Sequence, residues 1–120
     1  EMDPKDESAY AKRAATYYDL GNYNQAINDF NKAIELNPQF ALAYHNRGLA
    51  YAALGNSKRA INDYNKAIEL HPQLAQAYFN RSFAYGRLGN TKQAIADIKI
   101  AARLGYKKAQ DALREMNIDW

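Results

Sequence analysis

The sequence predicts an all-α fold, a right-handed α-solenoid of three helix-turn-helix units closed by a terminal capping helix, with seven helices in total. Three observations carry this prediction. The chain repeats itself every 34 residues, apolar residues recur at helical spacing within each repeat, and glycine or proline closes most of the helical stretches. No alternating apolar pattern that would indicate a β-strand competes with this reading.

The repeat covers most of the chain, which we treat as a single domain over residues 1–120. Residues 7–40, 41–74 and 75–108 align without a gap as repeats 1, 2 and 3, and twelve columns are identical in all three. In the middle repeat the identical columns include Tyr44, Tyr51, Ala60, Asp63 and Ala67. Each unit alone is too small to bury its apolar face, so the units are expected to stack on their neighbours.

The first helix of a repeat is clearest in the middle one. Tyr44, Gly48, Tyr51 and Leu54 recur at intervals of three and four residues, which places them on one side of a helix. Gly55 then ends the helix, because glycine readily adopts the left-handed conformation of a carboxy-terminal cap.

The second helix follows after a short turn. Ala60, Tyr64 and Ala67 lie on one stripe, and Pro72 closes the helix because the residue before a proline is disfavoured in helical geometry. Pro38 does the same in the first repeat. The small alanines allow close approach of helix backbones, and the tyrosines are expected to fill the remaining space.

The two ends of the array differ. At the start, Asp3 followed by Pro4 predicts a helix beginning there, with a capping side chain and a proline in the first turn. At the other end, residues 106–117 carry an apolar and a charged face, which predicts a capping helix. No comparable polar cap precedes the first repeat. We therefore expect either upstream sequence or another molecule there, including self-association through the amino-terminal edge.

The sequence resembles the tetratricopeptide repeat (TPR) family over residues 7–108. The resemblance rests on the 34-residue period, the closing prolines, the step from Ala60 to Tyr64, and the segments 43–48 and 67–72. It implies a non-enzymatic scaffold that binds a protein or peptide partner in a concave groove lined by the first helix of each repeat. Arg13, Arg47 and Arg81 depart from the family, because many members have leucine there. We expect these arginines to pair with Asp29, Asp63 and Asp97.

Helical spacing selects the residues of the implied groove, on the side of each first helix opposite the tyrosines. Leu49, Phe79 and Phe83 are apolar on this side with no evident core to enter, which is typical of a partner surface. The alternative is that neighbouring helices cover them. Polar neighbours are expected to bind a peptide backbone or carboxylate. The complete predicted site is Lys12, His45, Asn46, Leu49, Phe79, Asn80, Phe83 and Arg87.

One branch of the family grips the terminal carboxylate of a chaperone tail with two lysines, two asparagines and an arginine. The resemblance places Ala11, Ala15, Asn46, Gln76 and Asn80 at these five positions. Only Asn46 matches, and none of the five is positively charged. The sequence therefore predicts no chaperone-tail binding by this clamp.

The remaining function classes are narrowed by what the sequence lacks. It has no cysteine, no nucleophile or phosphate-loop motif, and no histidine spaced with a second metal ligand, so we expect no enzyme, no metal and no cofactor. No apolar run predicts a membrane span, and the composition is that of a folded soluble protein. The compartment stays open, because proteins of the cytoplasm and of the periplasm can both lack cysteine. The net charge of +3 is dispersed, which argues against nucleic acid. Binding of single-stranded RNA and a self-assembling structural array stay as alternatives.

Overall fold

The computed structural model describes residues 2–120, so Glu1 of the predicted domain lies outside it. Seven α-helices and no strand occur in this part of the chain, which confirms the predicted all-α solenoid. They are α1 (Glu7–Asp19), α2 (Tyr23–Leu36), α3 (Ala41–Ala53), α4 (Ser57–Leu70), α5 (Ala75–Arg87), α6 (Thr91–Arg103) and α7 (Lys107–Glu115).

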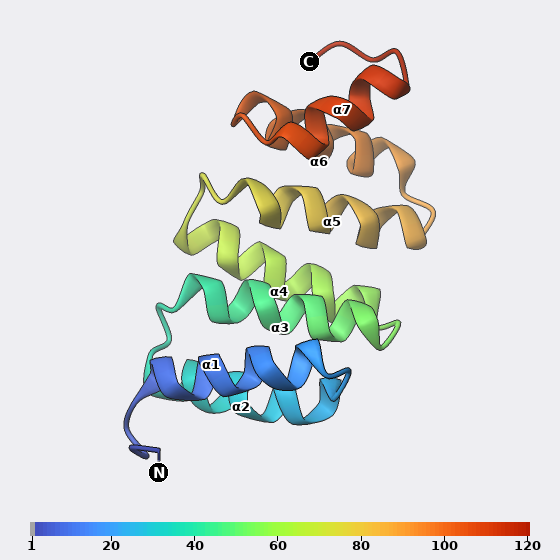
Figure 1. Cartoon of the computed structure of the whole chain (residues 1–120). Coiled ribbons are helices and arrows are strands. Elements are labelled where there is room, and N and C mark those ends of the chain that lie inside the picture. Colours follow the sequence, from blue (N-terminus) through green and yellow to red (C-terminus); the bar gives the residue numbers. More distant parts are fainter. Residues whose placement is uncertain (1) are drawn as a thin grey trace.

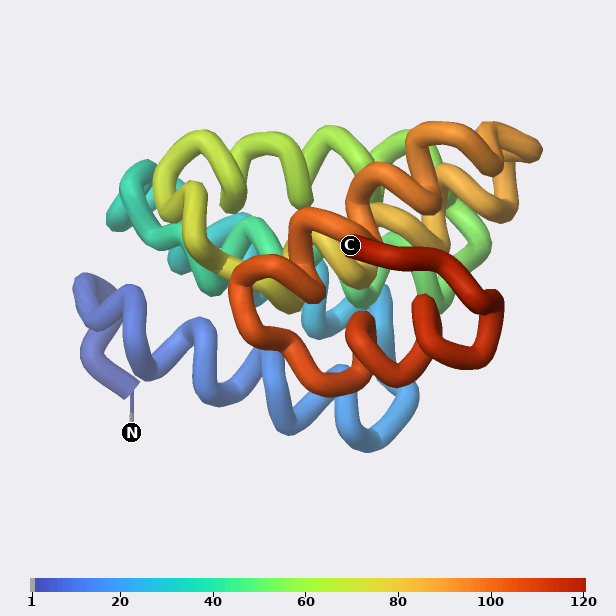
Figure 2. The backbone as a smooth tube through the Cα atoms, turned by 90° about the horizontal axis from the view of Figure 1, so that it is seen from above, coloured from blue at the N-terminus to red at the C-terminus, as the bar shows by residue number. Residues whose placement is uncertain are grey.

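The helices stack in chain order from one end of an elongated molecule of 51 × 25 × 20 Å to the other (Figure 1). The helices α1, α3 and α5 each pack on the even-numbered helix that follows, and each even-numbered helix then packs on the next odd-numbered helix. The first helices α1, α3 and α5 also contact one another in succession. The two termini lie at opposite ends of the stack (Figure 1). The view from above looks along the stack, with the C-terminal segment in front of the earlier helices (Figure 2).

Glycines end the first helices as the sequence predicts. Gly21, Gly55 and Gly89 have φ angles of about +80°, and Gly105 ends α6 in the same way. In the middle repeat this conformation lets the Asn56 N–H donate to the Tyr51 carbonyl, which satisfies an acceptor at the helix end. No side chain replaces glycine at these angles without backbone strain.

The start of α1 corrects one prediction. The cap is Asp6, whose Oδ1 accepts from the Ala9 N–H at 3.1 Å, and the helix begins at Glu7. Asp3 instead caps a separate turn, in which its side chain accepts from the Lys5 N–H and its carbonyl accepts from the Asp6 N–H. Both aspartates have a suitable capping side chain. The turn at Pro4 places only the second one beside the helix.

Small residues and aromatic rings share the core. The repeated alanines of the second helices are buried, and Phe30, Tyr64 and Leu113 are the largest fully buried side chains among the described residues. Gly48 shows how close the packing is: a Cβ added there would lie 2.7 Å from Tyr64 Cε1. The glycine thus provides the space that the Tyr64 ring occupies.

The predicted arginine–aspartate pairs are confirmed in all three repeats. Each arginine donates from Nε and Nη2 to both carboxylate oxygens, at 2.6–2.9 Å, and this double contact raises the pKa of all three guanidinium groups. Arg47 and Arg81 also donate from Nη1 to the Asn31 and Asn65 oxygens of the preceding second helix, both at 2.8 Å. The pairs therefore join helices within a repeat, and two of them also join successive repeats.

The capping helix is shorter than predicted. It spans Lys107–Glu115 instead of 106–117, because Asn117 adopts a left-handed conformation with φ of 58° and turns the chain back. The Ile118 N–H then donates to the Leu113 carbonyl, and Arg103 donates to the Trp120 carbonyl. As a result, nine helical residues follow α6, whereas thirteen follow α2 and α4.

Candidate functional site

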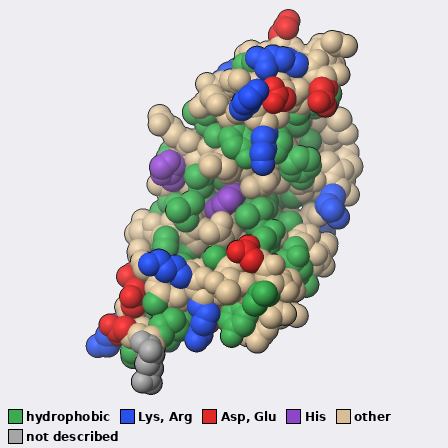
Figure 3. Space-filling model, viewed as in Figure 1, with side chains coloured by type: hydrophobic (Ala, Val, Ile, Leu, Met, Phe, Trp, Pro, Cys, Tyr) green, Lys and Arg blue, Asp and Glu red, His purple; other side chains and the backbone are tan. Residues whose placement is uncertain are grey.

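The site is a row of three hollows beside the first helices, and we call the face that carries them the groove face. Figure 3 views the molecule from the side on which these helices lie, and hydrophobic side chains form a nearly continuous band along it. Charged side chains are more frequent toward the two ends. Such an apolar surface between helices is a common place for a ligand to bind.

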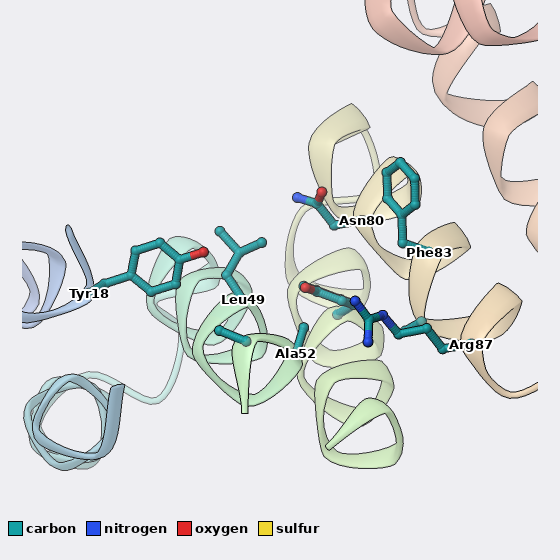
Figure 4. Close-up of a pocket in the computed structure, with 9 residues that line it drawn as sticks. Tyr18, Leu49, Ala52, Asn80, Phe83 and Arg87 are labelled. Carbon is teal, nitrogen blue, oxygen red and sulfur yellow. The ribbon is translucent and has the colours of Figure 1, made fainter. Parts of the chain in front are cut away.

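The second hollow lies between α3 and α5 and has a volume of about 230 Å³. In Figure 4, Leu49 and Asn80 face one another across the gap between these helices, while Tyr18 approaches from α1 and Arg87 from the end of α5. Tyr64 of α4 forms the floor, and burial raises the pKa of its hydroxyl. The complete lining is Tyr18, Leu49, Ala52, Ala53, Tyr64, Asn80, Phe83, Ala84 and Arg87.

The first hollow lies one repeat earlier, between α1 and α3, with a volume of about 210 Å³. Its floor is the buried ring of Phe30, and it shares Tyr18 and Leu49 with the second hollow. Asp19 brings a negative charge to its rim. The complete lining is Ala15, Tyr18, Asp19, Phe30, Asn46 and Leu49.

The third hollow lies against α5 and α6 and is the largest, at about 540 Å³. It shares Phe83 and Arg87 with the second hollow, and Met116 at the end of α7 closes only one side of it. Its size follows from the short α7, which leaves the last turn of α5 uncovered. The lining is Ser82, Phe83, Gly86, Arg87, Thr91, Ala94, Ile95, Ile98 and Met116.

Five of the eight residues predicted for the site line these hollows. Asn46 and Leu49 line the first, and Asn80, Phe83 and Arg87 line the second together with Leu49. Phe83 is 57% exposed and stands on the wall between the second and third hollows, where an incoming apolar group would contact it. The other three predicted residues, Lys12, His45 and Phe79, lie outside all three hollows.

The prediction that His45 contacts a peptide is corrected by the structure, because only 7% of this residue is exposed. Its Nδ1 lies 3.0 Å from the Asn46 Oδ1, and its Nε2 lies 3.0 Å from the Asn80 Nδ2. These contacts fit a neutral ring that donates from Nδ1 and accepts at Nε2. Burial lowers the pKa of His45 and favours this neutral form. His45 therefore bridges two groove residues and is not itself available to a peptide.

Phe79 is partly buried, because it packs against the core formed by α5, α6 and α7. Its ring centroid lies 5.2 Å from that of Tyr106 and 5.0 Å from that of Phe83. His45 and Phe79 occupy the same repeat position, which points at the next first helix and not into the groove. Lys12 is exposed and equivalent to Asn46, and it lies on α1, where no earlier hollow exists among the described residues.

Tyr18 is the main residue that the sequence reading missed. It lines both the first and second hollows, whereas only the repeated tyrosines were expected in the core. Tyr18 does not belong to a repeated tyrosine column, since Ala52 and Gly86 occupy its equivalents. Tyr18 follows Ala15 by three residues on α1, and this spacing places both side chains on the same face of the helix. The spacing could therefore have identified Tyr18 as a groove residue.

Two other kinds of site, a metal site and a membrane span, were sought among the described residues. Within residues 2–120, no group of three His, Cys, Asp or Glu side chains is placed to hold a metal ion. None of the seven helices combines the length and apolar character required to cross a membrane.

Family models identify the repeats. A model described as "TPR repeat" matches residues 14–55, and two described as "Tetratricopeptide repeat" match residues 41–74 and 63–96. Together they match the chain from residue 14 to residue 96. The chain belongs to the tetratricopeptide repeat family. No curated protein sequence matches the chain.

Solved TPR structures share the fold. MamA is 30% identical with a TM-score of 0.83, and the match covers 90% of this chain and 63% of MamA. The Arabidopsis OM64 TPR domain is 29% identical with a TM-score of 0.84, covering 92% and 95%. The second TPR of Spaghetti (RPAP3), bound to the HSP90 peptide SRMEEVD, is 26% identical with a TM-score of 0.80, covering 82% and 91%. The chain thus spans less than two thirds of MamA and most of the other two domains.

Proposed function

We propose that this TPR domain is a protein-interaction scaffold without a catalytic role, and that it binds a peptide segment of another protein on the groove face. The observation that carries the proposal is the row of hollows, in which Leu49 and Phe83 present apolar surface beside the amides of Asn46 and Asn80. Apolar contacts would supply the affinity of such a complex, and the amides would orient the peptide backbone. A similar domain, the second TPR of Spaghetti, is bound to a peptide.

The groove does not suit the acidic chaperone tail seen with that domain. The five positions of the family's carboxylate clamp hold Ala11, Ala15, Asn46, Gln76 and Asn80, none of which is positively charged. Arg87 is the one cation that lines the described hollows, and it lies at the far end of α5. We therefore infer a partner that is recognised mainly through apolar side chains.

A selection from a random-sequence peptide library tests the proposal. Selected peptides should bind the wild-type domain and lose at least tenfold in affinity to Phe83→Ser and to Ala53→Trp, which fills the second hollow at an exposed rim residue. The matched control is Leu20→Ser, which removes a more exposed leucine outside the three hollows.

The proposal fails if the selected peptides bind both groove variants as tightly as the wild type while the variants remain folded by circular dichroism. An RNA homopolymer that binds with a steep dependence on salt concentration would instead support the nucleic-acid alternative.

A further inference from the structure

The buried ring of His45 contacts two asparagines of the groove face, and these lie on different helices. Its Nδ1 lies 3.0 Å from the Asn46 Oδ1 on α3, and its Nε2 lies 3.0 Å from the Asn80 Nδ2 on α5. Asn46 lines the first hollow and Asn80 lines the second. The ring therefore connects the polar walls of two neighbouring hollows.

The orientation of each amide follows from its hydrogen bond to the ring. Asn46 turns its oxygen to His45, which leaves its nitrogen able to donate to a ligand. Asn80 turns its nitrogen to His45, and Figure 4 shows this nitrogen on the side of α3. The Asn80 oxygen is left to accept from a ligand. While the ring is neutral, the amide in the second hollow is thus an acceptor.

Protonation of His45 is incompatible with this arrangement. The charged ring donates from both nitrogens, so it needs an acceptor on each side. The Asn46 oxygen already accepts and can stay in place, whereas the Asn80 nitrogen would meet a second donor. A half-turn of the Asn80 amide about its Cβ–Cγ bond brings its oxygen to the ring. This torsion is broad and two-fold in asparagine, and Asn80 is only partly buried, so the turn requires no movement of the backbone.

The surroundings of the ring determine where it titrates. Tyr64 of α4 faces it, with the two ring centroids 5.7 Å apart, and burial raises the pKa of the Tyr64 hydroxyl and keeps it neutral. Asp19 and Arg87 are exposed charges that line the first and second hollows with the asparagines. The other charged side chains of α3, α4 and α5 are paired or exposed, namely Arg47 with Asp63, Arg81 with Asp97, Lys66 with Glu69, Lys58 and Arg59. Burial is the main cause that lowers the pKa of His45, so its protonation requires acid.

We propose that His45 is an acid-operated switch of the groove face, in which protonation of the ring turns the Asn80 amide over and changes the second hollow from a hydrogen-bond acceptor to a donor. Both asparagines then offer N–H groups, and a positive charge lies behind them. Ligand groups that accept, above all carboxylates, are favoured in acid, and groups that donate are favoured at neutral pH. This inference rests on the proposed function, because it regulates the same site.

NMR of the isotope-labelled domain tests the switch without a ligand. At pH 7.5 the proton of His45 should be on Nδ1, and a scalar coupling across the hydrogen bond should connect Nε2 with the Asn80 side-chain nitrogen. As the pH falls, both ring nitrogens should become protonated and this coupling should disappear. The side-chain amide signals of Asn80 should shift with the same midpoint as the ring.

Asn80→Asp should hold the ring in its protonated form. A carboxylate accepts from the Nε2–H and attracts the charged ring, so the titration midpoint of His45 should rise by about one pH unit or more. The matched control is Asn117→Asp, which makes the same charge change at an exposed residue after α7 and should leave the midpoint unchanged.

Peptides from the random library connect the switch to binding. Peptides selected at a pH below the measured midpoint of His45 should bind the wild-type domain at least tenfold more weakly at pH 7.5. His45→Gln cannot acquire the charge and should remove this difference. Circular dichroism establishes that the variants are folded at both pH values.

A proton on Nε2 at pH 7.5 overturns the inference, and so do Asn80 signals that do not follow the ring. Unfolding of the domain before the ring is protonated overturns it as well, as do acid-selected peptides that bind equally at pH 7.5. The proposed function is judged separately by the selection at neutral pH. If peptides need the hollows while the Asn80 signals stay fixed, only the switch fails. If the signals switch and no selected peptide needs the hollows, the proposed function fails.

Discussion

The first and middle repeats contain the same arginine–aspartate pair in different surroundings. The Arg47 side chain is 20% exposed and also bonds Asn31 of the preceding repeat, whereas the Arg13 side chain is 50% exposed and has no preceding helix among the described residues. Thr16 is likewise exposed where the middle repeat has the fully buried Ala50. The comparison teaches that the same ion pair contributes more to the free energy of unfolding where a neighbouring repeat packs on it.

Removal of the aspartate should show the largest difference between the two repeats. Asp63→Ala leaves the mostly buried Arg47 without its carboxylate, and we expect a loss of about 3 kcal/mol in the free energy of unfolding. Asp29→Ala should cost clearly less, because water can solvate Arg13. Urea unfolding followed by circular dichroism measures both, and equal losses would contradict the comparison.

Two helical glycines allow a second comparison of stability, between Gly48 in the middle repeat and Gly86 in the last repeat. Gly48→Ala places a Cβ against Tyr64 and should destabilise the domain by about 1–3 kcal/mol. Gly86→Ala meets no atom within 4 Å and should stabilise α5 by up to about 1 kcal/mol, because alanine is the better helix former. Thermal unfolding of the two variants should therefore shift in opposite directions.

The pH dependence of stability reports on the junction between the second and third repeats. The pKa of His45 is lowered in the folded state, so the unfolded chain binds the proton more tightly and acid favours unfolding. The contribution of neutral His45 is complete above pH 6.5 and is lost as the pH falls toward its folded pKa.

We expect a slope of at most about 1.4 kcal/mol per pH unit from this one group. His45→Gln should remove that part of the pH dependence while His71 remains. A variant with the unchanged wild-type slope between pH 7.5 and 5.5 would show that His45 is not the responsible group.

The smallest expected effect concerns the amides that join successive repeats. Asn31→Ala and Asn65→Ala each remove an acceptor from an arginine that keeps its carboxylate, and each should cost about 0.5–1 kcal/mol. Asn28→Ala, also exposed on α2, is the control and should cost less. Losses no greater than that of the control would mean that these bonds do not couple the repeats.

Much of the fold could be predicted because it depends on local patterns. Gly55 and Pro72 mark helix ends, and the spacing of Tyr44 and Tyr51 marks a helix face. The start at Asp3 was wrong, because a turn and a helix use the same capping chemistry and only the path of the chain distinguishes them. The groove was harder to predict, since helical spacing gives the direction of a side chain and not what lies above it.

The sequence by itself determined the number of helices, their order and the arginine–aspartate pairs, because each depends on residues at fixed spacing within one repeat. Only the tertiary structure decided which residues of the first helices remain open to a ligand. The next first helix covers His45, the start of α7 covers part of Phe79, and the early end of α7 leaves the third hollow open. The physical reason is that exposure depends on how far and at what angle the neighbouring helix extends, and this is a property of the stack and not of one repeat.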